Sequence, residues 1–134
     1  AKMRRGALND AAKRLGCNKV ALGHHREDAI ETLMMSMIFE GRLHTFHPNM
    51  FLPGVDVTVI RPMVYVSEKH IIHVARKLEL PVVHNPCPMD GHSRRQEIKQ
   101  MIASMCRTYP HLKDNMLAAL KNAEQYGLWD KKKI

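Results

Sequence analysis

Apolar residues in the first forty positions alternate between helical and strand spacings. Over residues 7–15 they recur at i, i+1, i+4, i+5 and i+8, which predicts one stripe of a helix, and Gly16 suits the left-handed cap that ends it. Residues 19–22 predict a short buried strand, and a second helical stripe runs over 29–38 and ends at Gly41. This order is typical of an α/β protein with a parallel sheet, because a strand buried on both faces needs helices to cover it.

The middle of the chain is interrupted by proline and glycine. Within residues 41–62, positions 56–60 alternate with the period of a strand, so we expect a loop or hairpin there. Helical spacing resumes after Ser67, a good N-cap, with a stripe over 71–78. Residues 80–83 predict a last short strand of the sheet.

The C-terminal third predicts two helices. A loop rich in proline, glycine and asparagine covers 84–92, and Ser93 with Gln96 form a capping box. The apolar stripe of the helix that follows comprises Ile98, Met101, Ile102 and Met105. A last helix over 112–123 precedes a basic tail.

Length and composition predict one packed domain. The chain has 134 residues, 45% of them apolar and 25% charged, which excludes a collagen-like, low-complexity or wholly disordered chain. Its apolar runs are too short for a membrane span and no leader is recognisable, so we expect a cytoplasmic protein with no membrane partner. Its net charge of +8 (21 basic minus 13 acidic residues) suits a phosphate-rich partner, although excess charge also serves solubility.

The densest polar cluster is Gly23-His24-His25-Arg26-Glu27-Asp28, between a predicted strand end and a predicted helix start. In open parallel sheets ligands bind at such strand ends, and the free N–H groups of a helix start favour an anion such as a nucleotide phosphate. The alternative is structural: His24 and Asp28 cap the helix and His25 is solvated.

The three cysteines do not form a disulfide framework, because their number is odd and their spacing wide. Cys87 lies in a proline-rich loop just before a helix that carries Arg94 and Arg95 in its first turn. A thiol there can act as a thiolate or metal ligand, and the alternative is an inert, half-buried cysteine. We expect Cys17 and Cys106 to be packing residues.

Basic side chains could form a nucleic-acid surface, with Arg4, Arg5, Arg94 and Arg95 as the candidate RNA-binding residues. The alternative is that these charges are merely solvated. With 5% aromatic residues the chain has few rings on which single-stranded bases could stack.

A resemblance to a known protein family helps to choose between these alternatives. The string from Ala21 to Thr32, A-L-G-H-H-R-E-D-A-I-E-T, resembles the second signature of the PP-loop ATP pyrophosphatases that modify tRNA, G-H-H-x-D-D-x-x-E-T. Within that group, residues 2–8, Gly41-Arg42-Leu43 and the Pro86-Cys87 loop resemble segments of the tRNA 2-thiocytidine-synthesis proteins. Residues 60–63, Ile-Arg-Pro-Met, followed by Glu68, resemble their R-P-L segment in the same order.

The resemblance implies an adenine-nucleotide α-hydrolase-like, three-layer fold with a parallel sheet and C-terminal helices. It also implies an ATP-dependent sulfurtransferase in which ATP with Mg adenylates a cytidine of the tRNA anticodon loop, and sulfur held on a four-iron cluster then displaces AMP. The ATP-binding residues would be Gly23, His24, His25 and Asp28. Cys87 would be an iron-sulfur ligand, and the resemblance places its partner ligands upstream of Ala1.

The sequence departs from the family pattern at two positions. Glu27 replaces the first Asp of the signature, and Asp90 stands where a second cysteine is usual. The chain also contains neither an S-G-G-x-D-S phosphate loop nor a C-x-x-C. Both belong to the family half that would precede Ala1, so we expect residues 1–134 to be the C-terminal part of one PP-loop domain, with a core over 1–92 and a helical segment over 93–134.

Several further expectations follow from a truncated domain. The chain alone should neither hydrolyse ATP nor assemble the cluster, because phosphate binding needs the missing loop's backbone amides. Its partners would be tRNA and a sulfur-donor protein, and strands left without neighbours could promote a homodimer. A tRNA-isoleucine lysidine synthetase-like ligase, or a non-catalytic basic RNA-binding module, is the alternative function.

Overall fold

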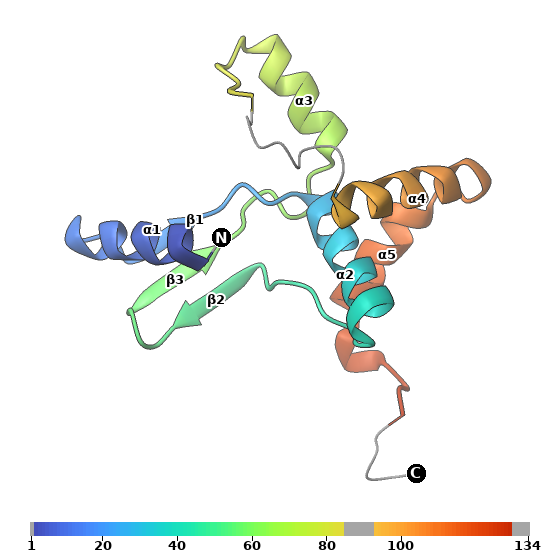
Figure 1. Cartoon of the computed structure of the whole chain (residues 1–134), viewed down its shortest axis with the longest axis horizontal. Helices are drawn as coiled ribbons and strands as arrows, with labels where there is room; N and C mark the ends of the chain where they lie inside the picture. Colours follow the sequence, from blue (N-terminus) through green and yellow to red (C-terminus); the bar gives the residue numbers. More distant parts are fainter. Residues whose placement is uncertain (1, 85–92, 130–134) are drawn as a thin grey trace.

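The computed structural model describes residues 2–84 and 93–129. Figure 1 shows the arrangement of their elements in space. In chain order these elements are α1 (Lys2–Arg14), β1 (Lys19–Ala21), α2 (Arg26–Glu40), β2 (Asn49–Leu52), β3 (Val57–Ile60), α3 (Glu68–Lys77), α4 (Arg94–Thr108), α5 (Leu112–Lys121) and the 3-10 helix η1 (Ala123–Gln125).

The helix ends lie where the glycine and serine residues of the sequence predict them. Gly16, after α1, has φ of 71°, and Gly41, after α2, has φ of 64°, a conformation that glycine adopts at little cost. Ser67 and Ser93 are the N-caps of α3 and α4, and each hydroxyl accepts a backbone N–H three residues on. The positions of these caps are confirmed, but of the capping box expected for Ser93 and Gln96 only the bond to the Ser93 hydroxyl is present among the described residues.

The sheet has three strands in the order β1-β3-β2. β1 and β3 are parallel, with Val20 opposite Val59, as expected for an α/β unit. β2 pairs antiparallel with β3, with Met50 also opposite Val59. The expected hairpin is therefore confirmed, and it makes the described sheet mixed rather than purely parallel.

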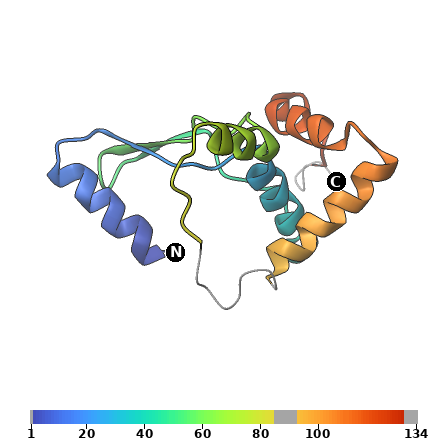
Figure 2. The same cartoon turned by 90° about the horizontal axis from the view of Figure 1, so that it is seen from above.

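Apolar residues gather in two separate cores. The first lies between α1 and the sheet, where Ala12 packs with Val20 and Val57. The second joins α2, α4 and α5 around Ile30, Ile98 and Ile102. Figure 2 shows α1 at one end of the molecule and these three helices at the other. On the sheet's second face Lys19 and Ala21 are exposed, so within residues 2–84 and 93–129 only one face of the sheet is covered by a helix, where the expected fold has three layers.

Two local expectations are wrong, the strand over residues 80–83 and the burial of Met101, and α3 packs against neither core. Residues 80–83 are not a strand, because no described strand lies beside them, and Val82 and Val83 are 81% and 90% exposed. The stripe of α3 is not buried: α3 projects away from both cores (Figure 1), and Val74 and Leu78 face solvent. Met101 also lies on the exposed side of α4.

The two described cysteines differ. Cys106 packs against the second core, as expected, whereas Cys17 is exposed and is not a packing residue. No helix in the described part of the chain has the length and apolar character that a membrane span requires.

Candidate functional site

The carboxyl ends of β1 and β3 lie side by side because these strands are parallel neighbours. The N–H of Leu22 donates to the carbonyl of Ile60 at 2.9 Å, which continues the pairing one residue past β1. The chain then leaves β1 through Gly23 and His24 and leaves β3 through Arg61. Their polar groups therefore meet at one edge of the sheet, where open α/β proteins bind ligands.

His25 begins α2 as its N-cap. Its Nδ1 accepts from the N–H of Asp28 at 3.4 Å, and the carboxylate of Asp28 accepts from the N–H of His25 at 3.0 Å. This is a capping box in which the cap is a histidine. The structural alternative is thus correct for Asp28 but assigns the histidines wrongly, because the cap is His25, which is partly buried rather than solvated, and not His24.

His24 takes no part in that capping box and contacts Arg61. The Nε of Arg61 donates to Nδ1 of His24 at 3.1 Å, and another guanidinium nitrogen donates to the carbonyl of His47. The ring of Phe46 lies against both, 4.7 Å from the His24 ring centre and 4.7 Å from the guanidinium carbon. Two adjacent histidines therefore have different partners and different surroundings.

Burial and neighbouring charges change both members of this pair. Burial lowers the pKa of His24, and the charge of Arg61 lowers it further, while Asp28 opposes the shift. Burial also lowers the pKa of Arg61, with a contribution from the positive charge of Arg5 on α1. Arg61 stays protonated, since a guanidinium titrates far above neutral pH.

Among the residues that the structure describes, Arg61 is a buried cation without a carboxylate partner. Only 8% of the residue is exposed. Its recorded partners are the neutral groups of His24 and His47, and no ion pair within residues 2–84 and 93–129 includes it. Because buried charges in proteins are normally paired or bound to an ion, this edge of the sheet suits an anionic ligand.

Glu27, where the family pattern has Asp, is 5% exposed and fully hydrogen-bonded. It accepts from the guanidinium of Arg26 at 2.8 and 3.2 Å and from the N–H of Glu68 at 2.8 Å, and Lys113 Nζ lies 3.6 Å away. Burial alone would raise the pKa of Glu27, but these hydrogen bonds and the charge of Arg26 outweigh it and lower the pKa. Glu27 thereby connects α2 to α3 and α5.

Arg95 connects α4 to three signature positions on α2. It donates to Thr32 at 3.1 Å and to Glu31 at 3.4 Å, and it lies 3.8 Å from Asp28. Glu31 is 4% exposed, and burial raises its pKa despite the nearby charges of Lys99 and Arg95. Glu31 and Thr32, the E-T pair that ends the signature, thus attach α4 to α2.

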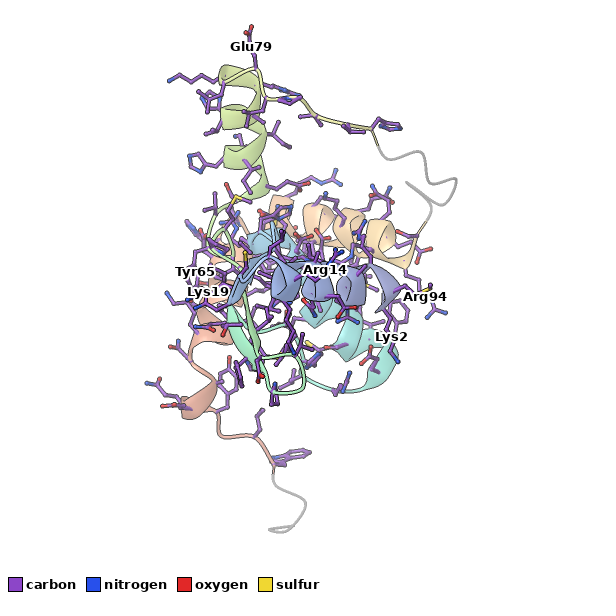
Figure 3. All side chains as sticks on the ribbon, turned by 90° about the vertical axis from the view of Figure 1, so that its left-hand side faces the viewer. Lys2, Arg14, Lys19, Tyr65, Glu79 and Arg94 are labelled. Atoms are coloured by element: carbon purple, nitrogen blue, oxygen red, sulfur yellow. The ribbon has the colours of Figure 1, made fainter. Side chains whose placement is uncertain are left out.

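The predicted ATP-binding residues lie together, and the predicted RNA-binding residues belong to the first turns of α1 and α4. Gly23, His24, His25 and Asp28 form the strand-to-helix turn, and a Cβ added at Gly23 would touch only Met63 Cε, at 3.5 Å. Figures 2 and 3 show the starts of α1 and α4 toward the same side of the molecule, marked by Lys2 and Arg94 in Figure 3. Arg4 and Arg5 are exposed on α1, and Arg94 lies over the ring of Phe39. Arg95 is partly exposed and pairs with Glu31 on α2.

Three positions named in the sequence-based expectations, Ala1, Cys87 and Asp90, lie outside the described residues. The expected cluster ligand and the expected origin of its partners upstream of Ala1 therefore stay predictions. Among the residues that are described, no three His, Cys, Asp or Glu side chains form a group that could hold a metal ion.

Sequence reasoning missed Arg61 and Phe46 as members of the site. For Arg61 a signal existed, because it is the arginine of the family-like R-P-M segment. Nothing in the sequence marks Phe46, which reaches His24 only through the fold.

Comparison with known proteins identifies the family of the chain. The model of the PP-loop domain family matches residues 1–106. A tRNA-cytidine(32) 2-sulfurtransferase of Geobacter sulfurreducens is 40% identical over 132 residues, which cover 97% of this chain and 51% of the relative. A protein of the same name from Citrifermentans bemidjiense is 41% identical over 133 residues, covering 98% and 52%.

A solved structure is also similar, that of the U34-tRNA thiolase NcsA from Methanococcus maripaludis with its 4Fe-4S cluster. The TM-score is 0.72 at 25% identity, over 96% of this chain and 44% of the thiolase. The chain thus spans about half the length of the relatives it matches. With 106 of its 134 residues matched, the chain belongs to the PP-loop domain family.

Proposed function

We propose that this chain forms one part of an ATP-dependent tRNA sulfurtransferase that thiolates a cytidine in the anticodon loop. The support is the name shared by its 40%-identical relatives, together with the order of the motifs along the chain. Because the chain spans about half of those relatives, the activity belongs to the whole protein rather than to residues 1–134 alone.

The observation that carries the proposal is the buried cation at the strand ends. Arg61 has no carboxylate partner among the described residues, and it lies beside His24 at the start of α2. A phosphate of ATP would supply the missing negative charge. The residues present therefore fit one wall of a nucleotide site, and Gly23, His24, His25 and Asp28 are its proposed ATP-binding residues.

The groups of this wall have separate tasks. When bound with Mg, ATP supplies an adenylyl group that makes the C2 oxygen of the cytidine a good leaving group. Arg61 neutralises phosphate oxygens, and His24 orients them by donating a hydrogen bond. The capping box of His25 and Asp28 fixes the turn, so that backbone N–H groups keep their positions when an anion arrives. A fixed arrangement of donors is what stabilises developing charge.

Cys87 is the proposed ligand of a four-iron cluster, which supplies the sulfur atom. One thiolate is too few to hold a cluster, so the other ligands must come from outside these residues, and the proposal places them in the segment upstream of Ala1. Cys106 is not a candidate, because it packs in the core of α2, α4 and α5.

The proposed substrate surface is basic and includes Arg4, Arg5, Arg94 and Arg95. The starts of α1 and α4, marked by Lys2 and Arg94 in Figure 3, lie toward one side of the molecule, which suits the phosphate backbone of tRNA. We further propose a cytoplasmic location, a sulfur-donor protein as partner, a homodimer, and a domain divided into a core over 1–92 and a helical segment over 93–134.

A chimera tests the function. Residues 1–134 replace the matched half of the Geobacter sulfurreducens relative, in a strain that lacks the relative's gene, and nucleosides of the purified tRNA are analysed by mass spectrometry. We expect 2-thiocytidine to reappear. Lysidine instead would assign the chain to the ligase. A soluble, folded chimera that binds RNA with steep salt dependence, ignores ATP and modifies nothing would favour the RNA-binding module.

The isolated chain provides a complementary measurement. Isothermal titration calorimetry with ATP and Mg should show weak binding at most, since one wall lacks the phosphate loop. Tight binding by the 134-residue chain would contradict the proposed division of the site.

A further inference from the structure

The contact between Arg61 and His24 determines which ring nitrogen of His24 carries a proton. A neutral imidazole has one N–H donor and one acceptor nitrogen, and which nitrogen is which is set by the partners. The Nε of Arg61 lies 3.1 Å from Nδ1 of His24. A guanidinium has only donors, so Nδ1 of His24 must be the acceptor.

Among the residues that the structure describes, the other nitrogen of the ring has no hydrogen-bond partner. Within residues 2–84 and 93–129 nothing hydrogen-bonds to Nε2 of His24, and every fully buried side-chain nitrogen there has a partner. With these residues alone considered, Nε2 is not a fully buried atom and can reach a ligand. With Nδ1 accepting, Nε2 carries the hydrogen and is a donor.

We propose that Arg61 is a positioning residue of the nucleotide site, which holds His24 in its neutral tautomer with Nε2–H free to donate to an anionic oxygen of the ligand. The second half of this inference rests on the proposed function. The first half, the tautomer, is a property of the chain itself. In this role His24 is a neutral donor rather than a general base or a cation.

Several features of the site keep the tautomer fixed. Arg61 is 8% exposed and also held by the carbonyl of His47, and Phe46 covers both side chains. Protonation of His24 at Nδ1 would place a new cation against a buried guanidinium. The other charged or titratable groups that act on His24 are Asp28 and His25 on α2 and Arg95 on α4, and of these only the carboxylate of Asp28 favours protonation.

Nitrogen-15 NMR of the 134-residue chain tests the inference, because long-range couplings from the ring protons separate the two nitrogens. The His24 signals are assigned as those missing from His24→Gln. We expect an unprotonated Nδ1 and a protonated Nε2, and a titration midpoint below the ordinary histidine value of about 6.5. A protonated Nδ1 in the wild-type chain near neutral pH would overturn the proposal.

Two variants separate positioning from simple structural support. In Arg61→Met the His24 signals should change to a mixture of both tautomers, and the midpoint should move up toward about 6.5. In the control Arg42→Met, an exposed arginine that pairs with Glu40, both should stay as in the wild type. Unchanged His24 signals in a folded Arg61→Met chain would also overturn the proposal, and if that variant does not fold the wild-type spectrum decides.

The outcome is separable from that of the proposed function, because the NMR measurement needs neither ATP nor tRNA. If the tautomer is confirmed but the chimera does not thiolate tRNA, Arg61 still positions His24, and the site has another function. Thiolation with the opposite tautomer would overturn the role inferred for Arg61 and leave the proposed function in place.

Discussion

The carboxylate of Glu27 accepts a hydrogen bond from the backbone N–H of Glu68 at 2.8 Å, which joins the first turns of α2 and α3. α3 buries none of its own residues, so this bond and the ion pair between Glu68 and Lys99 at 2.8 Å hold its start in place. Glu27 occupies a departure from the family pattern, and its longer side chain has a clear structural use here.

Glu27→Gln should destabilise the chain. The amide loses the charge that faces Arg26 and Lys113, and hydrogen bonds to buried charged groups contribute a few kcal/mol. We expect the free energy of unfolding, measured with urea at neutral pH, to fall by about 2 kcal/mol. The pH dependence has a definite sign. Because the folded state lowers the pKa of Glu27 from 4.5, its contribution is present above 4.5 and is lost as the pH falls through the folded value. An unchanged free energy at neutral pH would contradict the described network.

Glu31→Gln should behave in the opposite way, although both carboxylates are almost fully buried. Burial raises the pKa of Glu31 above 4.5, so the folded state binds more protons and the wild type loses stability as the pH rises between 4.5 and the folded value. We expect the amide to leave the free energy of unfolding unchanged or higher at neutral pH. A loss as large as that of Glu27→Gln would show that the ion pair with Arg95 outweighs burial.

The apolar stripes of α3 and α4 should contribute differently to the free energy of unfolding. Ile98 is 1% exposed in the core of α2, α4 and α5, so Ile98→Ala should cost about 3 kcal/mol. Val74 in the stripe of α3 is 45% exposed, and Val74→Ala should cost less than about 1 kcal/mol. Urea unfolding of both variants makes the comparison. Equal costs would mean that α3 is covered in solution.

Arg94 and Arg95 are neighbours with different tasks. Arg95→Met removes the bonds to Thr32 and Glu31 and should lower the free energy of unfolding by about 1 kcal/mol. Arg94→Met should leave stability within about 0.5 kcal/mol, since Arg94 is exposed over Phe39. If both face tRNA, each should reduce the salt slope of binding by about one. A tRNA affinity unchanged in both variants would remove this side from the proposed RNA surface.

Sequence periodicity predicted most elements because their signals are local. Gly16, Gly41, Ser67 and Ser93 end or begin helices through their own backbone or side-chain chemistry, and each lies at a helix end as expected. Burial is not local. The stripe of α3 and the extended residues 80–83 have the right pattern for a core and a strand, but no described element covers them.

The sequence predicted where the site lies but not which side chains contact one another in it. The motif located the turn of His24 and His25, since strand ends and helix starts determine where ligands bind. It did not assign their partners, because Phe46 and Arg61 come from the part of the chain that leads into β2 and follows β3, and only the fold brings them to His24. A capping box built on a histidine was likewise outside the usual Ser, Thr, Asp and Asn preferences.

The central claim is that this chain completes a thiolating site to which Cys87 contributes a cluster ligand. The most direct measurement compares Cys87→Ala with Cys17→Ala, an exposed cysteine far along the sequence, in the chimera with the Geobacter sulfurreducens half. Cluster absorbance and the 2-thiocytidine content of tRNA are recorded for each. The account predicts that Cys87→Ala abolishes both while Cys17→Ala retains both, and thiolation that survives Cys87→Ala would contradict it.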